Sequence, residues 1–231
     1  MNVLSHTGNL AYVGHFQGNA MKNYVDVCDE FSKKAITVTP KVSVIMAYNN
    51  EEKAITALQL KLSNQAYENA CTNKEKAWTN IDKIKYYVDA LEKTLSEYTL
   101  LVDAYDVVFF KNIDDEFIEK YKTMNKEIVF NATKNNYPNL TIEGEKLGEG
   151  EFKYLNAGIA FGKTEKLLEL YKEALRQTQR EDIINPWKSE QLFVRLSAIN
   201  NENVGIDSEC KLFQTFSKTQ RVECGTNIII L

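Results

Sequence analysis

Two aspartates, Asp103 and Asp106, stand in a short polar gap between two apolar runs of the sequence. The run before them, residues 98–102, has the composition of a strand buried on both faces of a sheet. In open α/β sheets, ligands gather at the carboxyl ends of such strands. Two carboxylates held together there repel each other unless a cation lies between them or one of them takes up a proton.

The residue types of this pair indicate which cation would fit. Hard divalent ions such as Mg²⁺ and Mn²⁺ are bound by oxygen ligands, and aspartates at a strand end supply them. A plain turn is the alternative, because Asp is also common where strands end. The position of the pair between apolar runs favours a divalent metal site, since ionised carboxylates near a core need a partner.

The elements that must position the pair follow an alternating pattern. Short apolar runs predict strands, and stretches with apolar residues at helical spacing predict helices. The predicted strands are 42–48, 98–102, 107–110, 127–130, 154–161 and 204–206; the predicted helices are 51–62, 79–95, 114–124, 164–179 and 189–199. A polar stretch over 132–151 is expected to form a long surface loop. Alternation of this kind predicts one α/β domain with a mostly parallel sheet over residues 41–231.

The two ends of the chain do not fit this alternation. Residues 1–40 are expected to form a separate N-terminal segment, and residues 1–20 are interpreted as a tag or tail without functional weight. The two histidines, His6 and His15, are assigned to that tail. At the other end, the apolar run 228–231 is interpreted either as the mark of a truncated chain or as a buried terminal strand.

Composition excludes several classes of protein. The 28 basic and 32 acidic residues give a net charge of −4, without the basic excess of a nucleic-acid-binding domain. No apolar run approaches the roughly 20 residues that span a bilayer, and no signal peptide is seen. The 4 cysteines lack the close spacing of zinc ligands and are expected to be reduced thiols. We therefore expect a soluble cytoplasmic protein.

A resemblance to a known family begins at the aspartate pair. The string Leu101-Val102-Asp103-Ala104-Tyr105-Asp106-Val107-Val108-Phe109 resembles the aspartate motif in the glycosyltransferase domain of procollagen lysyl hydroxylases and their microbial and viral relatives. Tyr154-Leu155-Asn156-Ala157-Gly158 is similar to that family's Phe-Leu-Asn-Ser-Gly, and Glu190-Gln191-Leu192-Phe193 to its Asp-Gln-Leu-Phe. Further similar segments, in the family's order, are Lys83-Ile84-Lys85 before the motif and Ile206-Asp207 with Leu212-Phe213-Gln214 after it.

The resemblance implies a fold of the GT-A type, with a Rossmann-like, mostly parallel mixed sheet flanked by helices. It implies that Asp103 and Asp106 hold Mn²⁺ (or Mg²⁺), which binds the diphosphate of a UDP-sugar. The uridine side of this donor would be bordered by Tyr105, by Lys83 and by the segment Met46-Ala47-Tyr48.

The same resemblance implies the residues on the sugar side. Asn156 and Gly158 would line the donor-sugar pocket, where a glycine lets the backbone approach a ligand closely. Glu190 would stand next to the reacting sugar, with Gln191 as its neighbour, and Asn156, Glu190 and Gln191 are the candidate catalytic residues. A purely structural interpretation of the last two is that acids are favoured at the start of a helix by its dipole.

Two departures from the family's pattern concern the metal and the acceptor. The family supplies a third metal ligand, a His in a His-x-Asn-Gly segment after a late apolar strand. Here the apolar run 228–231 takes the place of that strand and no His follows it. In the acceptor-side loop, Tyr137-Pro138 stands where relatives have Trp-Pro.

The predicted function is transfer of a hexose, glucose or galactose, from a UDP-sugar to a hydroxyl acceptor, of the hydroxylysine or glycan type. A non-catalytic sugar-nucleotide or glycan-binding module of the same fold is the first alternative, because the third metal ligand is missing. A haloacid-dehalogenase-type phosphatase is the second, but its acids are spaced D-x-D and not D-x-x-D.

Overall fold

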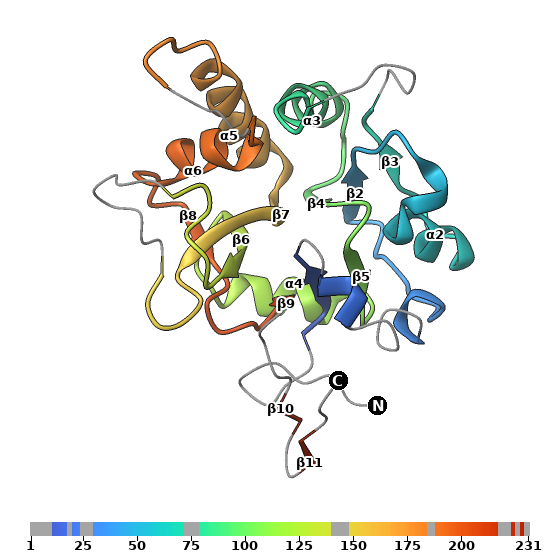
Figure 1. Ribbon diagram of the computed structural model, residues 1–231. Helices are drawn as coiled ribbons and strands as arrows, with labels where there is room; N and C mark the ends of the chain where they lie inside the picture. Colours follow the sequence, from blue (N-terminus) through green and yellow to red (C-terminus); the bar gives the residue numbers. More distant parts are fainter. Residues whose placement is uncertain are drawn as a thin grey trace.

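The structure is a computed structural model that describes residues 11–17, 20–23, 30–71, 79–139, 148–183, 188–216, 223–224 and 227–228 (Figure 1). His6 and the rest of the first ten residues lie outside the described part, as does most of the apolar run 228–231. The expectations for these segments are therefore not tested.

A central sheet carries the fold. Within the described residues it has six strands in the order β3-β2-β4-β7-β6-β8. In chain order these strands are β2 (Val42–Met46), β3 (Glu68–Asn69), β4 (Tyr98–Val102), β6 (Ile128–Thr133), β7 (Tyr154–Lys163) and β8 (Val204–Ile206). The pairs β3/β2, β2/β4 and β6/β8 are parallel, whereas β7 runs antiparallel to both β4 and β6. The sheet is thus mixed, as expected.

Helices cover both faces of this sheet. One core cluster joins α3 (Asp82–Leu91), α5 (Thr164–Gln177) and α6 (Glu190–Ala198) to one face, and Figure 1 shows these three helices grouped on the same side. A second cluster joins α2 (Ile55–Leu62) and α4 (Asp115–Lys122) to the other face. Side chains of β4 alternate between them: Leu101 faces the first cluster, and Leu100 and Val102 face the second.

A second, smaller sheet brings the two ends of the described chain together. It has the order β5-β1-β9, with β1 (Val13–Phe16), β5 (Val107–Phe109) and β9 (Phe213–Phe216). Strand β1 is antiparallel to β5 and parallel to β9, and all four of its residues are buried. The interpretation of residues 1–20 as a tail is therefore wrong for residues 11–16, whose apolar side chains need this burial.

The remaining described elements are short. They are the 3₁₀ turns η1 (Ala20–Asn23) and η2 (Glu51–Lys53) and the hairpin of β10 (Glu223–Cys224) with β11 (Asn227–Ile228). No helix in the described part of the chain combines the length and the apolar composition that a membrane crossing needs. Of the expected elements, the strand at 98–102 and the strand at 204–206 are found with the expected bounds, and each expected helix is found with a shorter span.

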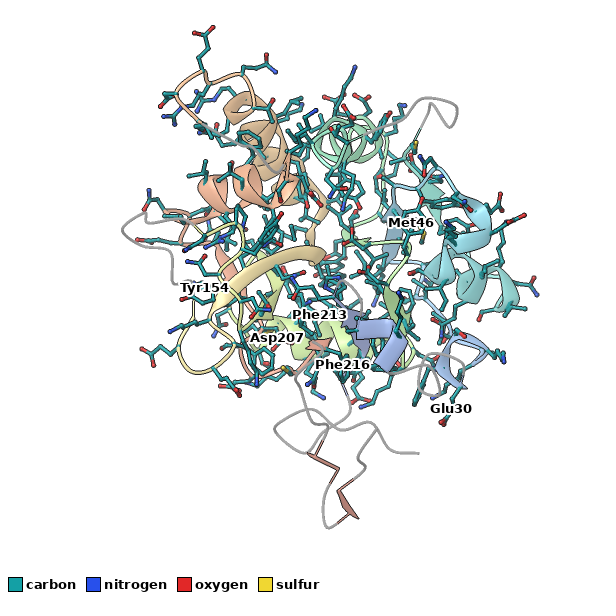
Figure 2. The ribbon with its side chains drawn as sticks, viewed as in Figure 1. Glu30, Met46, Tyr154, Asp207, Phe213 and Phe216 are labelled. Carbon is teal, nitrogen blue, oxygen red and sulfur yellow. The ribbon has the colours of Figure 1, made fainter. Side chains whose placement is uncertain are left out.

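A buried carboxylate connects the two sheets. Asp207 follows β8 and is fully buried, and its two oxygens accept hydrogen bonds from the backbone N–H groups of Lys211 (2.9 Å), Leu212 (2.6 Å) and Phe213 (2.8 Å). Figure 2 shows Asp207 close to Phe213 and Phe216 of β9. These hydrogen bonds hold the turn between β8 and β9, and so fix the start of β9 where it pairs with β1.

We predict that Asp207→Ala lowers the free energy of unfolding by about 2 to 4 kcal/mol, because three backbone N–H groups lose their acceptor and two of them, those of Leu212 and Phe213, are buried. Asp207→Asn keeps one acceptor oxygen, so its loss is expected to be smaller. Urea unfolding followed by circular dichroism measures both. Equal stability of wild type and Asp207→Ala would show that the turn is held by other contacts.

Candidate metal and donor site

The aspartate pair lies in a turn between the two sheets. Strand β4 ends at Val102, and the backbone N–H of Asp103 donates to the carbonyl of Gly158 on the neighbouring β7 (2.8 Å). The buried Thr56, in the first turn of α2, donates from its hydroxyl to the carbonyls of Asp103 (3.1 Å) and Val107 (2.7 Å). Its backbone N–H donates to the carbonyl of Ala104 (3.2 Å). Helix α2 therefore fixes the shape of the turn that carries both carboxylates.

A histidine that the sequence analysis assigned to a tail faces this turn. The Nε2 atom of His15, on β1, lies 3.4 Å from Oδ2 of Asp106 and 3.9 Å from Oδ2 of Asp103. The imidazole is buried, whereas the two aspartate side chains are 23% and 25% exposed. The assignment of His15 to a tail is wrong, because β1 carries it into the space between the sheets.

These three side chains fit a divalent metal ion. Each offers one ligand atom, and these atoms all lie within 4.8 Å of one another. Ligands at about 2.1 Å from one ion are about 3 to 4 Å apart, which matches the separations from Nε2 of His15 to the two carboxylates. The two carboxylates are ligands of the type that Mn²⁺ and Mg²⁺ prefer, and the imidazole adds a ligand typical of transition-metal ions.

A sequence motif for the third ligand is present, but near the start of the sequence and not after its late apolar run. The segment His15-Phe16-Gln17-Gly18 resembles the His-x-Asn-Gly segment that was sought after the run 228–231. In the family's order that segment follows a late strand. Here the histidine comes instead from β1, a strand of the N-terminal region that lies parallel to β9.

Electrostatics agree with a cation at this place. Burial alone would lower the pKa of His15, but the carboxylates of Asp106 and Asp103 outweigh it, so that this pKa is raised. Burial raises the pKa of Asp103, and the charge of Asp106 adds to the rise although Lys83 opposes it. Burial thus disfavours the ionised form of Asp103, and a cation between the two carboxylates would offset that penalty.

Gly158 makes room for the ligand set. A Cβ atom at this position would lie 2.5 Å from Cε1 of His15 and 2.9 Å from Oδ2 of Asp103. Gly158 lies in an irregular part of β7, since the pairing with β6 shifts between Phe130 and Asn131. Asn156 stabilises this irregularity, because its Oδ1 accepts the backbone N–H of Gly158 (2.9 Å). Gly158 therefore borders the metal-ligand set, and Asn156 is linked to that set through the backbone of Gly158.

Lys83 joins two of the predicted site residues. Its ammonium, on α3, lies 2.5 Å from Oδ1 of Asp103 and 2.5 Å from Oε1 of Glu190 on α6. Burial would lower the pKa of Lys83, but the two carboxylates hold it well above its ordinary value. The ammonium therefore stays charged, and it occupies the Asp103 oxygen that does not face His15.

The amide of Gln191 links strand β7 to the loop after β6. Its Oε1 accepts the backbone N–H of Ala157 (3.0 Å), and its Nε2 donates to the carbonyl of Tyr137. The buried guanidinium of Arg195 donates to the carbonyl of Pro138 (2.9 Å) and to Oδ1 of Asn136 (2.7 Å). Helix α6 thus holds this loop next to the site, with the ring of Tyr137 44% exposed.

Apart from Lys83, the residues predicted for the uridine side meet at the end of β2. The side chains of Met46, Ala47 and Tyr48 are all buried. The hydroxyl of Tyr105 donates to Oδ1 of Asn49 (2.8 Å) and accepts the backbone N–H groups of Asn49 (3.0 Å) and Asn50 (3.1 Å). Tyr105 thereby ties the aspartate turn to the turn after β2.

The fold and the site define a class: an α/β domain with a mixed central sheet and a carboxylate-imidazole cluster beside the end of a central strand. More particularly, residues 36–225 match the family model described as the PLOD GT domain, and the chain belongs to that family. This confirms the resemblance drawn from the sequence. It makes the chain a glycosyltransferase domain, whose family implies a sugar-nucleotide donor and an acceptor.

Curated relatives are distant and longer. The chain is 28% identical over 144 residues to procollagen-lysine,2-oxoglutarate 5-dioxygenase 1 of Mus musculus, a match that covers 57% of this chain and 18% of the relative. It is 24% identical over 152 residues to an uncharacterised protein of Acanthamoeba polyphaga mimivirus, covering 64% of this chain and 30% of that protein. The chain therefore spans less than a third of the length of either relative.

Solved structures resemble the fold only loosely. A 4-diphosphocytidyl-2C-methyl-D-erythritol synthase from Anaerococcus prevotii superposes with a TM-score of 0.36 at 10% identity, over 80% of this chain and 93% of that one. S. aureus TarS (residues 1–349) gives 0.34 at 15% identity, over 75% and 60%.

We predict that Gly158→Ala weakens Mn²⁺ binding about tenfold or more, because the added methyl group would displace the ring of His15 or the carboxylate of Asp103. Isothermal titration calorimetry with MnCl₂ measures the affinity. Gly205→Ala is the matched control, since a Cβ there meets first the flexible side chain of Lys126. Unchanged affinity in Gly158→Ala would mean that the close approach is not needed for binding.

We predict that Lys83→Met lowers the free energy of unfolding in EDTA by about 3 kcal/mol, because it leaves two carboxylates near the core without their cation. The double variant Lys83→Met/Glu190→Gln should recover part of this loss, since one of the two charges is gone. Urea unfolding of both variants and of Glu190→Gln completes the cycle. Additive effects of the two substitutions would contradict a direct interaction.

Proposed function

We propose that the chain is a metal-dependent glycosyltransferase that moves a hexose from a UDP-sugar to a hydroxyl acceptor. The observation that carries this proposal is the cluster of His15, Asp103 and Asp106 beside the end of β4, in a chain that belongs to a family of glycosyltransferase domains. Glucose and galactose are both donor candidates.

His15, Asp103 and Asp106 would hold Mn²⁺ or Mg²⁺, whose positive charge offsets that of the diphosphate leaving group. Lys83 opposes the rise in the pKa of Asp103 and holds one of its oxygens, which leaves the oxygen facing His15 for the metal. Lys83 was expected to reach toward the nucleotide; its two ion pairs support instead a role in positioning Asp103 and Glu190.

The sugar side of the site would be formed by β7 and α6. Gly158 borders the metal-ligand set, and Gly158 and Asn156 would line the donor-sugar pocket. Glu190, with its Oε1 held by Lys83, would present its carboxylate next to the reacting sugar. Gln191 has both ends of its amide engaged in backbone contacts, which supports a positioning role and not a direct catalytic one.

The nucleotide side would be formed by the ends of β2 and β4. Because Met46, Ala47 and Tyr48 are buried, they would support the uridine site from beneath. Tyr105, half-buried with its hydroxyl on the turn after β2, would border the uridine. On the acceptor side, the exposed ring of Tyr137 would take the place of the tryptophan of relatives.

The non-catalytic alternative rested on the lack of a third metal ligand. His15 supplies a ligand atom of the missing type, so this argument against turnover no longer holds. The phosphatase alternative finds no support in the family to which the chain belongs.

We predict that UDP raises the melting temperature of the protein only when Mn²⁺ is present, and that GDP and CMP raise it less. At 100 times its dissociation constant a ligand stabilises a one-site protein by about 2.7 kcal/mol, which is a shift of several degrees. His15→Ala, Asp103→Asn and Asp106→Asn should each abolish the Mn²⁺-dependent shift, and turnover of UDP-glucose or UDP-galactose with it.

Asp115→Asn is the matched control, because it also removes a carboxylate but from an exposed ion pair with Lys41. It should keep the full shift with UDP and Mn²⁺. A shift by UDP that is the same in EDTA, or that survives in Asp103→Asn, would contradict the proposed metal site. Hydrolysis of UDP-sugars at wild-type rates in Asp103→Asn and Asp106→Asn would contradict the proposed mechanism.

A further inference from the structure

A buried asparagine lies behind the histidine of the metal-ligand set. Asn131, on β6, has no exposed surface, and its Nδ2 lies 3.4 Å from Nδ1 of His15 and 2.8 Å from the hydroxyl oxygen of Thr215. Its Oδ1 is buried and has no hydrogen-bond partner among the described residues. A buried polar side chain with an unsatisfied oxygen lowers the stability of the fold, so a function of Asn131 is the natural explanation for its presence in the strand.

The alternation along β6 explains where this side chain points. Phe130 and Ala132 belong to the core cluster beneath α3, α5 and α6, so Asn131 between them faces the opposite side. On that side lie β1 and β9, which carry His15 and Thr215 at paired positions of the smaller sheet. Asn131 thus lies beside the Nδ1 atom of the His15 ring.

The two nitrogens of His15 have different tasks. Nε2 faces Asp106 and Asp103 and would bind the metal, which requires a lone pair on Nε2 and therefore the hydrogen on Nδ1. That Nδ1–H needs an acceptor. Without metal, Nε2 can instead carry the hydrogen toward Asp106, and Nδ1 then needs a donor.

Asn131 offers both a donor and an acceptor. A half-turn of its amide exchanges Oδ1 with Nδ2, and so changes the group that faces Nδ1 of His15. The hydroxyl of Thr215 now donates to the carbonyl of Ala132 (2.8 Å) and accepts from Nδ2. Because a hydroxyl can also donate to an amide oxygen, Thr215 can partner either orientation of Asn131. One orientation suits the metal-free ring and the other the metal-bound ring.

We propose that Asn131 is a positioning residue for the metal: its amide oxygen accepts the Nδ1–H of His15 and so holds Nε2 ready as a ligand. This inference rests on the proposed metal site but concerns a residue outside the ligand set. Its role requires an acceptor at position 131 and not merely a side chain of that size.

The test compares two substitutions of nearly equal size in the full chain. Asn131→Leu removes the acceptor, and we expect it to weaken Mn²⁺ binding about 10- to 100-fold, the usual effect of losing such a partner. Asn131→Asp keeps an acceptor, and we expect binding within a few-fold of wild type. The signal of free Mn²⁺ in electron paramagnetic resonance, without nucleotide, gives the dissociation constants.

A second readout reports the ring itself. Long-range ¹H–¹⁵N spectra of the imidazoles with saturating Mg²⁺ should show His15 with its hydrogen on Nδ1 in wild type and in Asn131→Asp. In Asn131→Leu we expect the form with the hydrogen on Nε2 to gain population. The chain has 2 histidines, so the variant His6→Ala assigns the spectrum.

Thr99→Val is the control for a merely structural effect. It removes a buried hydroxyl that is bonded to Thr164 near the far end of β4 (2.8 Å), and should lower stability without changing Mn²⁺ binding. Unchanged Mn²⁺ binding in Asn131→Leu, with binding lost in His15→Ala, would overturn this inference and leave the proposed function standing. Mn²⁺ binding of wild type that is no tighter than that of Asp103→Asn would overturn both.

Discussion

The carboxylate of Asp103 is the group on which the site depends. Its Oδ1 is held by the ammonium of Lys83, and its Oδ2 faces the imidazole of His15. A charge in a largely buried place needs compensation on each side. That requirement brings α3, which carries Lys83, and β1, which carries His15, to the end of β4. Glu190 on α6 is drawn to the same place because it shares the ammonium of Lys83.

Strand β7 lets these elements approach each other. It crosses the sheet antiparallel to both neighbours and becomes irregular near Gly158. The missing side chain of Gly158 leaves the space that His15 and Asp103 occupy. Two side chains hold the backbone of β7 at this space. Asn156 accepts the N–H of Gly158, and Gln191 accepts the N–H of Ala157. Residues that a motif suggests as catalytic can therefore act by fixing a strand.

How far the sequence predicts this molecule depends on how local the cause is. Strand β4 is found with its expected bounds because an apolar run is ended by charged residues within the same stretch of chain. The alternation of strands and helices predicted a mostly parallel sheet and did not show that β7 is antiparallel to its neighbours. No helix is seen among the described residues between β6 and β7, and strands joined without a helical crossover pair antiparallel. The contact of Lys83 with both carboxylates joins three elements, and no local pattern encodes it.

Strand β1 shows the limit most clearly. Its four residues include Gly14 and His15, so neither length nor composition marks them as a strand. These residues form a strand because they pair with β5 on one side and with β9 on the other, both more than 90 residues further along the chain. Gly14 is needed there, since a Cβ would lie 2.3 Å from the ring of Phe110. Because the same strand carries His15, the proposed metal ligand, docking of β1 and binding of a metal at His15 would favour each other, and each would stabilise the other by the same free energy.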